Sequence, residues 1–149
     1  MLRDAVEQSG VVEFARSGIL VLDADGFDKE HQRWCRSIVE YLQSHGISAS
    51  FGRAAKLVAI YLKSMLILDG TIEAERTRFI HPPIDGILLR NLCKAPDLQP
   101  KYKATWKNLT WTKLTESEYY RLIEQLRMCA KGEPFWTLEK YWTVTEDNA

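Results

Sequence analysis

Apolar residues recur at steps of three and four along most of the chain, and this spacing is typical of amphipathic helices. We expect helices over residues 2–17, 27–44, 52–68, 84–92, 115–131 and 135–142. Residues 19–22 are a short apolar run with strand character, but no segment of comparable strength offers it a partner. The pattern therefore predicts an all-α fold, a compact bundle of five to seven helices.

Residues 52–68 are the most hydrophobic segment, and apolar side chains occur on every side of the expected helix. Lys56, Lys63 and Ser64 interrupt that surface. A helix that is apolar all round is buried on most sides, so we expect this one at the centre of the bundle.

Local signals mark the ends of several elements. Gly10 weakens the first helix, and residues 23–26 predict a turn. Thr115 and Glu118 form a capping box that opens a helix. Residues 95–114 contain two prolines and predict a long loop, with three aromatic anchors: Tyr102, Trp106 and Trp111.

Composition limits the class of protein. The chain has 149 residues, of which 46% are hydrophobic and 27% charged, so we expect one helical domain over residues 1–149. No apolar run is long enough to span a membrane. The first residues are acidic where a secretory leader would be basic, and the three dispersed cysteines fit a reducing compartment, so we expect a cytoplasmic protein.

The sequence predicts neither a metal nor a cofactor. His31 and Cys35 lie one helical turn apart, but two ligands do not make a metal site and no third ligand is near in sequence. The chain has no glycine-rich phosphate loop and no Gly-x-Ser-x-Gly motif. These absences argue against a nucleotide-dependent enzyme and against a serine hydrolase.

Charge is unevenly distributed, although the net charge is zero. Residues 51–113 hold 11 Lys and Arg against 5 Asp and Glu, a balance of +6, and the segments on either side are each at −3. A basic middle segment would suit a phosphate-rich partner. The alternative is that the charges neutralise one another in the folded protein.

Two local features could carry chemistry. Lys56 follows Gly52 and Arg53 in the first turn of the expected central helix, where the helix dipole and burial both favour a neutral, nucleophilic amine. Asp85 follows Pro82-Pro83 in the first turn of the next helix, as a rigidly aimed carboxylate. The structural alternatives are a lysine that extends to solvent and an ordinary capping acid.

Taken together, Lys56 and Asp85 resemble the layout of the helix-hairpin-helix DNA glycosylase superfamily. Residues 52–56 would stand for the end of the hairpin, and residues 82–85 for the aspartate motif. The 29-residue separation looks like the archaeal 8-oxoguanine glycosylase branch, where this connection is extended. The resemblance covers residues 51–93, and of the usual Gly-x-Gly hairpin only one glycine is present.

The resemblance implies a base-excision glycosylase/lyase that acts on or binds DNA. A damaged nucleotide would be flipped out of the duplex, and Lys56 would attack its sugar to form a Schiff base. Asp85 would stabilise the positive charge that develops on the sugar. Aromatic stacking on the base and contacts to phosphates would come from Trp106, Trp111, Trp136, Arg53 and Lys63.

Two other classes of function remain open. One is a non-catalytic helical module that binds a protein or another partner. The other is a helical subunit of a larger assembly. The relative position of Lys56 and Asp85 separates these readings from the enzyme, because a glycosylase needs both side chains at one cleft.

Overall fold

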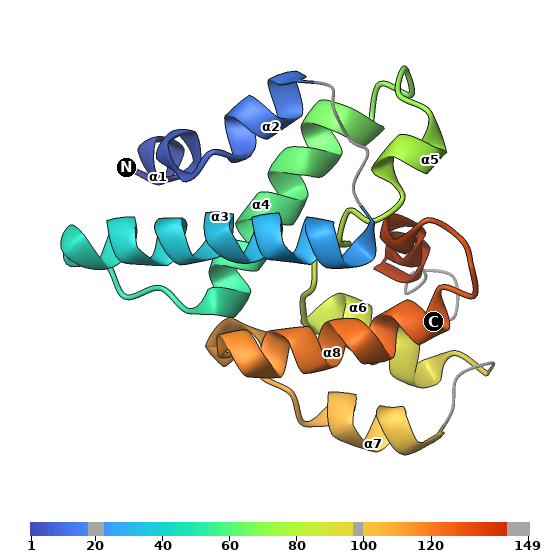
Figure 1. Cartoon of the computed structure of the whole chain (residues 1–149). Coiled ribbons are helices and arrows are strands. Elements are labelled where there is room, and N and C mark those ends of the chain that lie inside the picture. Colours follow the sequence, from blue (N-terminus) through green and yellow to red (C-terminus); the bar gives the residue numbers. More distant parts are fainter. Residues whose placement is uncertain (18–22, 97–99, 143–149) are drawn as a thin grey trace.

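The computed structural model describes residues 1–17, 23–96 and 100–142, and in these ranges it is all helical, as expected (Figure 1). The α-helices are α1 (Leu2–Ser9), α2 (Val11–Ser17), α3 (Ala24–Ser44), α4 (Phe51–Leu62), α5 (Ala74–Thr77), α6 (Gly86–Lys94), α7 (Pro100–Lys107) and α8 (Glu116–Cys129). A π-helical turn, η1 (Lys63–Ile67), and two 3-10 segments, η2 (Trp111–Lys113) and η3 (Phe135–Trp142), complete the described elements. The apolar run at residues 19–22 lies outside the described residues.

Helix α4 is the centre of the bundle. It passes behind the long helix α3 in Figure 1 and packs against α2, α3, α8 and η2. Its buried face includes Ala55, Val58 and Leu62, and η1 continues it to Ile67. The prediction of a central buried helix over residues 52–68 is therefore confirmed, with π-helical geometry in its last turn.

Two helix ends differ from the expectation. The first predicted helix is divided into α1 and α2, because Gly10 has a left-handed backbone with φ of 96°. Residues 23–26, expected as a turn, instead begin α3: Asp23 is the N-cap, and its side chain accepts a hydrogen bond from the Gly26 N–H at 2.7 Å. Asp28 and His31 lie in the N-terminal half of this helix.

The prediction of a long loop over residues 95–114 was wrong. Pro100 starts α7, and proline is well tolerated at the first position of a helix. Helix α7 packs against α6, and Trp106 is 1% exposed with its indole N–H donated to Gln125 Oε1 at 2.8 Å. The break at Gly10, this helix and the short helix α5 bring the described residues to eight α-helices rather than five to seven, although the expected last helix is the 3-10 segment η3.

The remaining global expectations concern membranes and cysteines. Within the described residues, none of the helices is both long and apolar enough to cross a bilayer. Cys35, Cys93 and Cys129 are free thiols, as expected for dispersed cysteines.

Candidate functional site

The start of α4 positions Lys56. Ser50 is the N-cap, and its hydroxyl accepts a hydrogen bond from the Arg53 N–H at 3.2 Å. Lys56 is the sixth residue of the helix and therefore lies in the second turn, not the first. Because the effect of the helix dipole fades within the first turn, the dipole acts on Lys56 less than the sequence suggested.

Asp85 is the N-cap of α6 rather than a residue of its first turn. Its Oδ1 accepts a hydrogen bond from the Leu88 N–H at 3.0 Å, and its Oδ2 accepts one from Lys56 Nζ at 3.1 Å. The carboxylate therefore caps one helix and pairs with a lysine on another. The Asp85 side chain therefore fits both alternatives considered for it: it is a capping acid, and it is also a carboxylate aimed at a lysine.

The pair lies at the boundary between the core and the surface. The Asp85 side chain is 7% exposed and that of Lys56 is 25% exposed. Lys56 also lies over the indole of Trp111, with Nζ 4.6 Å from the ring centroid. The ammonium is therefore close to a carboxylate and to an aromatic face, and part of it still reaches solvent.

A cavity of about 310 Å³ opens beside Lys56. Lys56, Arg53 and Trp111 line it together with apolar residues of α1, α3, α4 and the segment between α3 and α4, among them Leu42, Ile47, Leu57 and Ile60. Asp85 is not among its lining residues. The expectation that both side chains line one cleft is therefore not met: Lys56 lines the cavity, and Asp85 contacts Lys56 without lining it.

Of the other five predicted site residues, the structure brings only two to Lys56, namely Arg53 and Trp111. Lys63 forms an ion pair with Glu139 of η3. Trp106 is buried, so a base cannot stack on its indole. Trp136 is half-buried and donates its indole N–H to Thr77 Oγ1 at 3.2 Å. These three residues support the fold around η1, α7 and η3.

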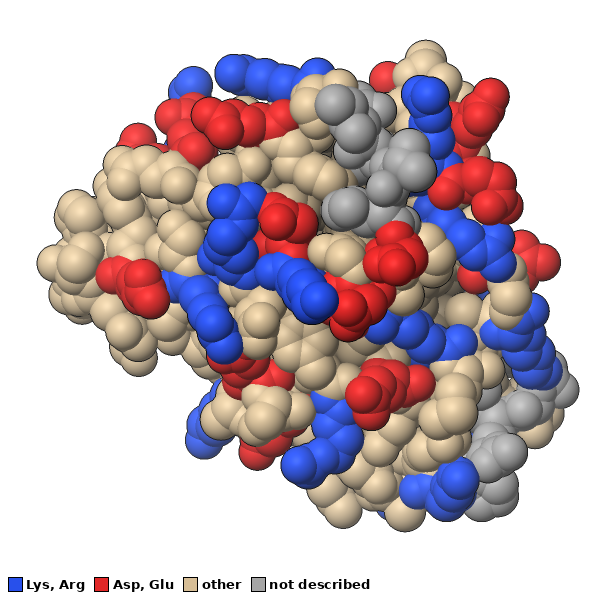
Figure 2. Space-filling view, viewed as in Figure 1, with Lys and Arg blue, Asp and Glu red and all other residues tan. Residues whose placement is uncertain are grey.

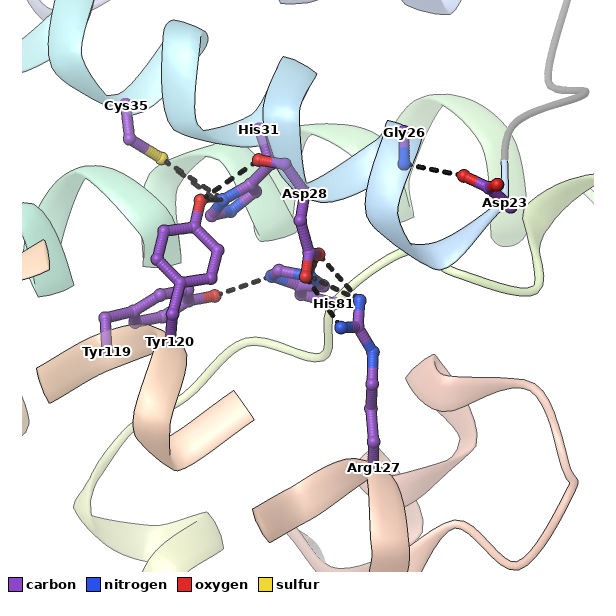
Figure 3. A network of polar contacts seen from close by, with 9 residues as sticks. All are labelled: Asp23, Gly26, Asp28, His31, Cys35, His81, Tyr119, Tyr120 and Arg127. Carbon is purple, nitrogen blue, oxygen red and sulfur yellow. Dashed lines mark hydrogen bonds and ion pairs between the residues drawn. The ribbon is translucent and has the colours of Figure 1, made fainter. Parts of the chain in front are cut away.

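Sequence reasoning missed a partly buried polar network centred on Asp28 of α3 (Figure 3). Arg127 of α8 donates two hydrogen bonds to its carboxylate, each of 2.6 Å. His81 Nε2 lies 2.8 Å from Asp28 Oδ1, and His81 Nδ1 lies 2.9 Å from the hydroxyl of Tyr119. The available signal was that Asp28 and Arg127 each adjoin a buried apolar position of their helix.

Burial sets the protonation states in this network. Burial lowers the pKa of His81, and the pKa of His31 lies well below its usual value for the same reason. Burial alone would raise the pKa of Asp28, but hydrogen bonds from His81 and Arg127 outweigh it and the pKa is lowered. Asp28 is therefore an anion and His81 is neutral, with its Nε2–H donated to Asp28 and its Nδ1 accepting from Tyr119.

A second histidine extends the same network. His31 Nδ1 lies 2.8 Å from the Tyr120 hydroxyl, and that hydroxyl donates to the Asp28 carbonyl at 3.3 Å. Cys35 Sγ is 3.7 Å from His31 Nε2, and burial holds the pKa of this thiol well above its usual value. No group of three metal-ligand side chains occurs in the part of the chain that the structure describes.

The network joins three parts of the fold. Tyr119 and His81 are each 1% exposed, whereas the side chains of Asp28 and Arg127 are 22% and 24% exposed. The contacts join α3, α8 and the segment that leads into α6. His81 lies four residues before Asp85, so anchoring its ring also fixes the chain that aims the Asp85 carboxylate at Lys56.

Charge does not gather into one sign on the face shown in Figure 2, where Lys and Arg alternate with Asp and Glu. Within the basic middle segment, Lys56 pairs with Asp85 and Arg78 with Glu75, and Lys63 pairs with Glu139 outside the segment. On this face the charges follow the alternative in which opposite signs neutralise one another.

Comparison of the chain with protein-family models, with curated proteins and with solved structures finds no match. Function is therefore inferred from the geometry of the Lys56 site.

Proposed function

We propose that this protein is a DNA glycosylase/lyase in which Lys56 is the nucleophile and Asp85 its carboxylate partner. The observation that carries the proposal is the 3.1 Å contact between Lys56 Nζ and Asp85 Oδ2, side chains 29 residues apart in sequence. A partly exposed lysine beside a buried carboxylate and a cavity is an arrangement suited to covalent catalysis.

The chemistry follows from these positions. Asp85 takes a proton from the Lys56 ammonium and leaves a neutral amine. The amine nitrogen then bonds to C1′ of an extruded nucleotide as the bond from C1′ to the base breaks, and the base leaves with the electron pair and the proton that Asp85 had taken, which restores the carboxylate. A proton then moves from the bound nitrogen to the ring oxygen, the sugar ring opens, and a protonated Schiff base forms between Lys56 and C1′. The carboxylate stabilises the positive charge that the sugar carries in the transition state.

The cavity beside Lys56 supports the same proposal. Its wall is mostly apolar, with Arg53 and Lys56 as the cations at its edge. Such a surface suits a flat base attached to a phosphate backbone, because apolar side chains contact the ring and a guanidinium contacts a phosphate.

The alternative is a non-catalytic binding module, and one observation favours it. Leu2, Ile47 and Ile60 line the cavity and are 57%, 37% and 43% exposed. Exposed apolar side chains around a hollow are also typical of a surface that binds another protein. In this alternative the Lys56–Asp85 pair is a structural contact.

Borohydride trapping separates the two functions. The protein is incubated with duplexes that carry an abasic site, an oxidised base or an alkylated base, and borohydride is added to reduce any Schiff base. We expect a covalent complex with at least one duplex, and its loss in Lys56→Ala. Lys29→Ala is the matched control, because Lys29 pairs with Asp25 at 3.0 Å in an exposed position. Absence of trapping by the wild-type protein on every duplex would leave the binding module.

A further inference from the structure

The segment before α8 lies in close contact with the start of α4. A Cβ atom at Gly52 would lie 2.2 Å from the carbonyl oxygen of Trp111, so only glycine fits at this position. The Gly52 N–H donates to the Leu114 carbonyl at 3.1 Å, and the Ser50 hydroxyl donates to the Thr112 carbonyl at 2.6 Å. Three contacts therefore fix η2 against the helix that carries Lys56.

These contacts place the Trp111 indole against the amine of Lys56. Lys56 Nζ is 4.6 Å from the ring centroid and 3.1 Å from Asp85 Oδ2. An ammonium over an indole face is attracted by the ring quadrupole, and the contact is strongest with tryptophan. The ring and the carboxylate therefore both restrict where the amine can lie.

The indole also reaches the beginning of α6. A Cβ atom at Gly86, the residue after Asp85, would lie 3.9 Å from Trp111 Cδ1 and 2.9 Å from Arg90 Nη1. Trp111 is thus next to both helices whose side chains form the pair. A residue in this place can set the distance between the amine and the carboxylate.

We propose that Trp111 is the positioning residue for Lys56, and that its indole holds the amine in line with Asp85 and the cavity. The close approach at Gly52 holds Trp111 in place. This inference rests on the proposed function, in which Lys56 is the nucleophile. It differs from the base-stacking role expected from sequence, because the indole face covered by Lys56 is not available to a base.

The test uses two measurements on the same variants. The first is the rate at which formaldehyde and cyanoborohydride methylate Lys56, followed by mass spectrometry with exposed Lys29 as the internal reference. The second is borohydride trapping on abasic duplex. The variants are Trp111→Phe, which keeps an aromatic face, Trp111→Leu, which keeps an apolar side chain without one, and Gly52→Ala, which displaces the segment.

The expected pattern depends on the ring. Lys56 should be methylated about threefold faster in Trp111→Leu and in Gly52→Ala, because the ammonium loses its aromatic partner. In the same two variants the covalent complex with DNA should form at least about tenfold more slowly, because the amine is misplaced. Trp111→Phe should stay close to the wild-type protein in both measurements. Thermal melts restrict the comparison to variants that stay folded at the assay temperature.

The outcomes are distinct. Equal behaviour of Trp111→Leu and Trp111→Phe would overturn the inference, because bulk alone would then be sufficient. Wild-type protein that does not trap DNA, together with faster methylation only in Trp111→Leu and Gly52→Ala, would reject the proposed function and retain the positioning role. If Gly52→Ala and Trp111→Leu both fail to fold, Trp111→Phe and Trp111→Tyr provide the test, because both keep an aromatic face. A methylation rate of Lys56 that differs from wild type in both variants would overturn the inference.

Discussion

The Lys56–Asp85 pair and the network around Asp28 are both ion pairs between segments distant in sequence, and they differ in their surroundings rather than in exposure. Both oxygens of the Asp28 carboxylate receive side-chain donors, and the adjoining His81 and Tyr119 are buried. Lys56 instead lies beside a cavity, although its side chain, at 25%, is about as exposed as those of Arg127 and Asp28, at 24% and 22%. A pair joined to further buried side chains stabilises a fold, whereas a pair with one member at a cavity can also react.

The two regions are also mechanically connected. His81 and Asp85 lie on one short segment whose prolines restrict its backbone. The network fixes one end of this segment through His81, and the N-cap of α6 fixes the other through Asp85. Rigid support behind an accessible pair is the arrangement expected of a preorganised site.

The largest effect on stability should come from breaking the network around Asp28. Asp28→Asn should reduce the free energy of unfolding by about 3 kcal/mol, because Arg127 keeps its charge and loses a bidentate partner in a partly buried place. Asp25→Asn is the control, because its exposed pair with Lys29 should contribute well under about 1 kcal/mol. Urea unfolding followed by circular dichroism measures both, and equal values would contradict the distinction drawn between the two kinds of pair.

Asp85→Asn should affect chemistry more than folding. Asparagine is a good N-cap, so the helix α6 should stay intact. Base removal should slow by about 100-fold, because the amide neither accepts the proton of Lys56 nor stabilises charge on the sugar. Single-turnover kinetics measure the rate and a thermal melt measures the fold. A variant that melts as early as Asp28→Asn would make this pair structural as well.

Acid should weaken the network through its histidines. Burial lowers the pKa of both His31 and His81, so below pH of about 6.5 the unfolded chain binds protons that the folded chain does not. Stability should therefore fall as the pH drops, by up to about 1.4 kcal/mol per pH unit for each histidine. The lowered pKa of Asp28 adds a further loss below pH of about 4.

Urea titrations between pH 7.5 and 5 check this slope. His81→Gln should reduce the slope towards that of one histidine. A stability that does not vary over this range would show that the two buried rings do not titrate on unfolding.

The smallest effect should be on DNA affinity. Arg53→Gln removes an exposed cation from the edge of the cavity, so binding of duplex DNA at low salt should weaken a few-fold, by about one phosphate contact. The slope of log affinity against log salt should fall by about 0.9 for the same reason. Gel-shift titrations at several salt concentrations measure both. Wild-type protein that causes no shift at micromolar concentration would count against a nucleic-acid partner.

Local sequence signals determined the helical class, the central helix and the cap at Thr115. These features depend on apolar spacing over one or two turns and on side chains that bond their own backbone, so they can be predicted without knowing the fold. Lys56 and Asp85 were found in the same way, since each belongs to a short motif at a helix start. Their contact was a hypothesis until the packing of α4 and α6 was known.

Only the tertiary structure decided how the site is built. Asp28 meets His81 across 53 residues and Arg127 across 99, and no local pattern predicts such pairs. Helix α7 has weak amphipathic spacing, and it is stabilised by packing of Trp106 and by contact with α6. Trp111 reaches Lys56 because Gly52 lets two backbones approach. Contacts of this kind depend on which surfaces meet when the helices pack, and that is a property of the whole chain rather than of any one segment.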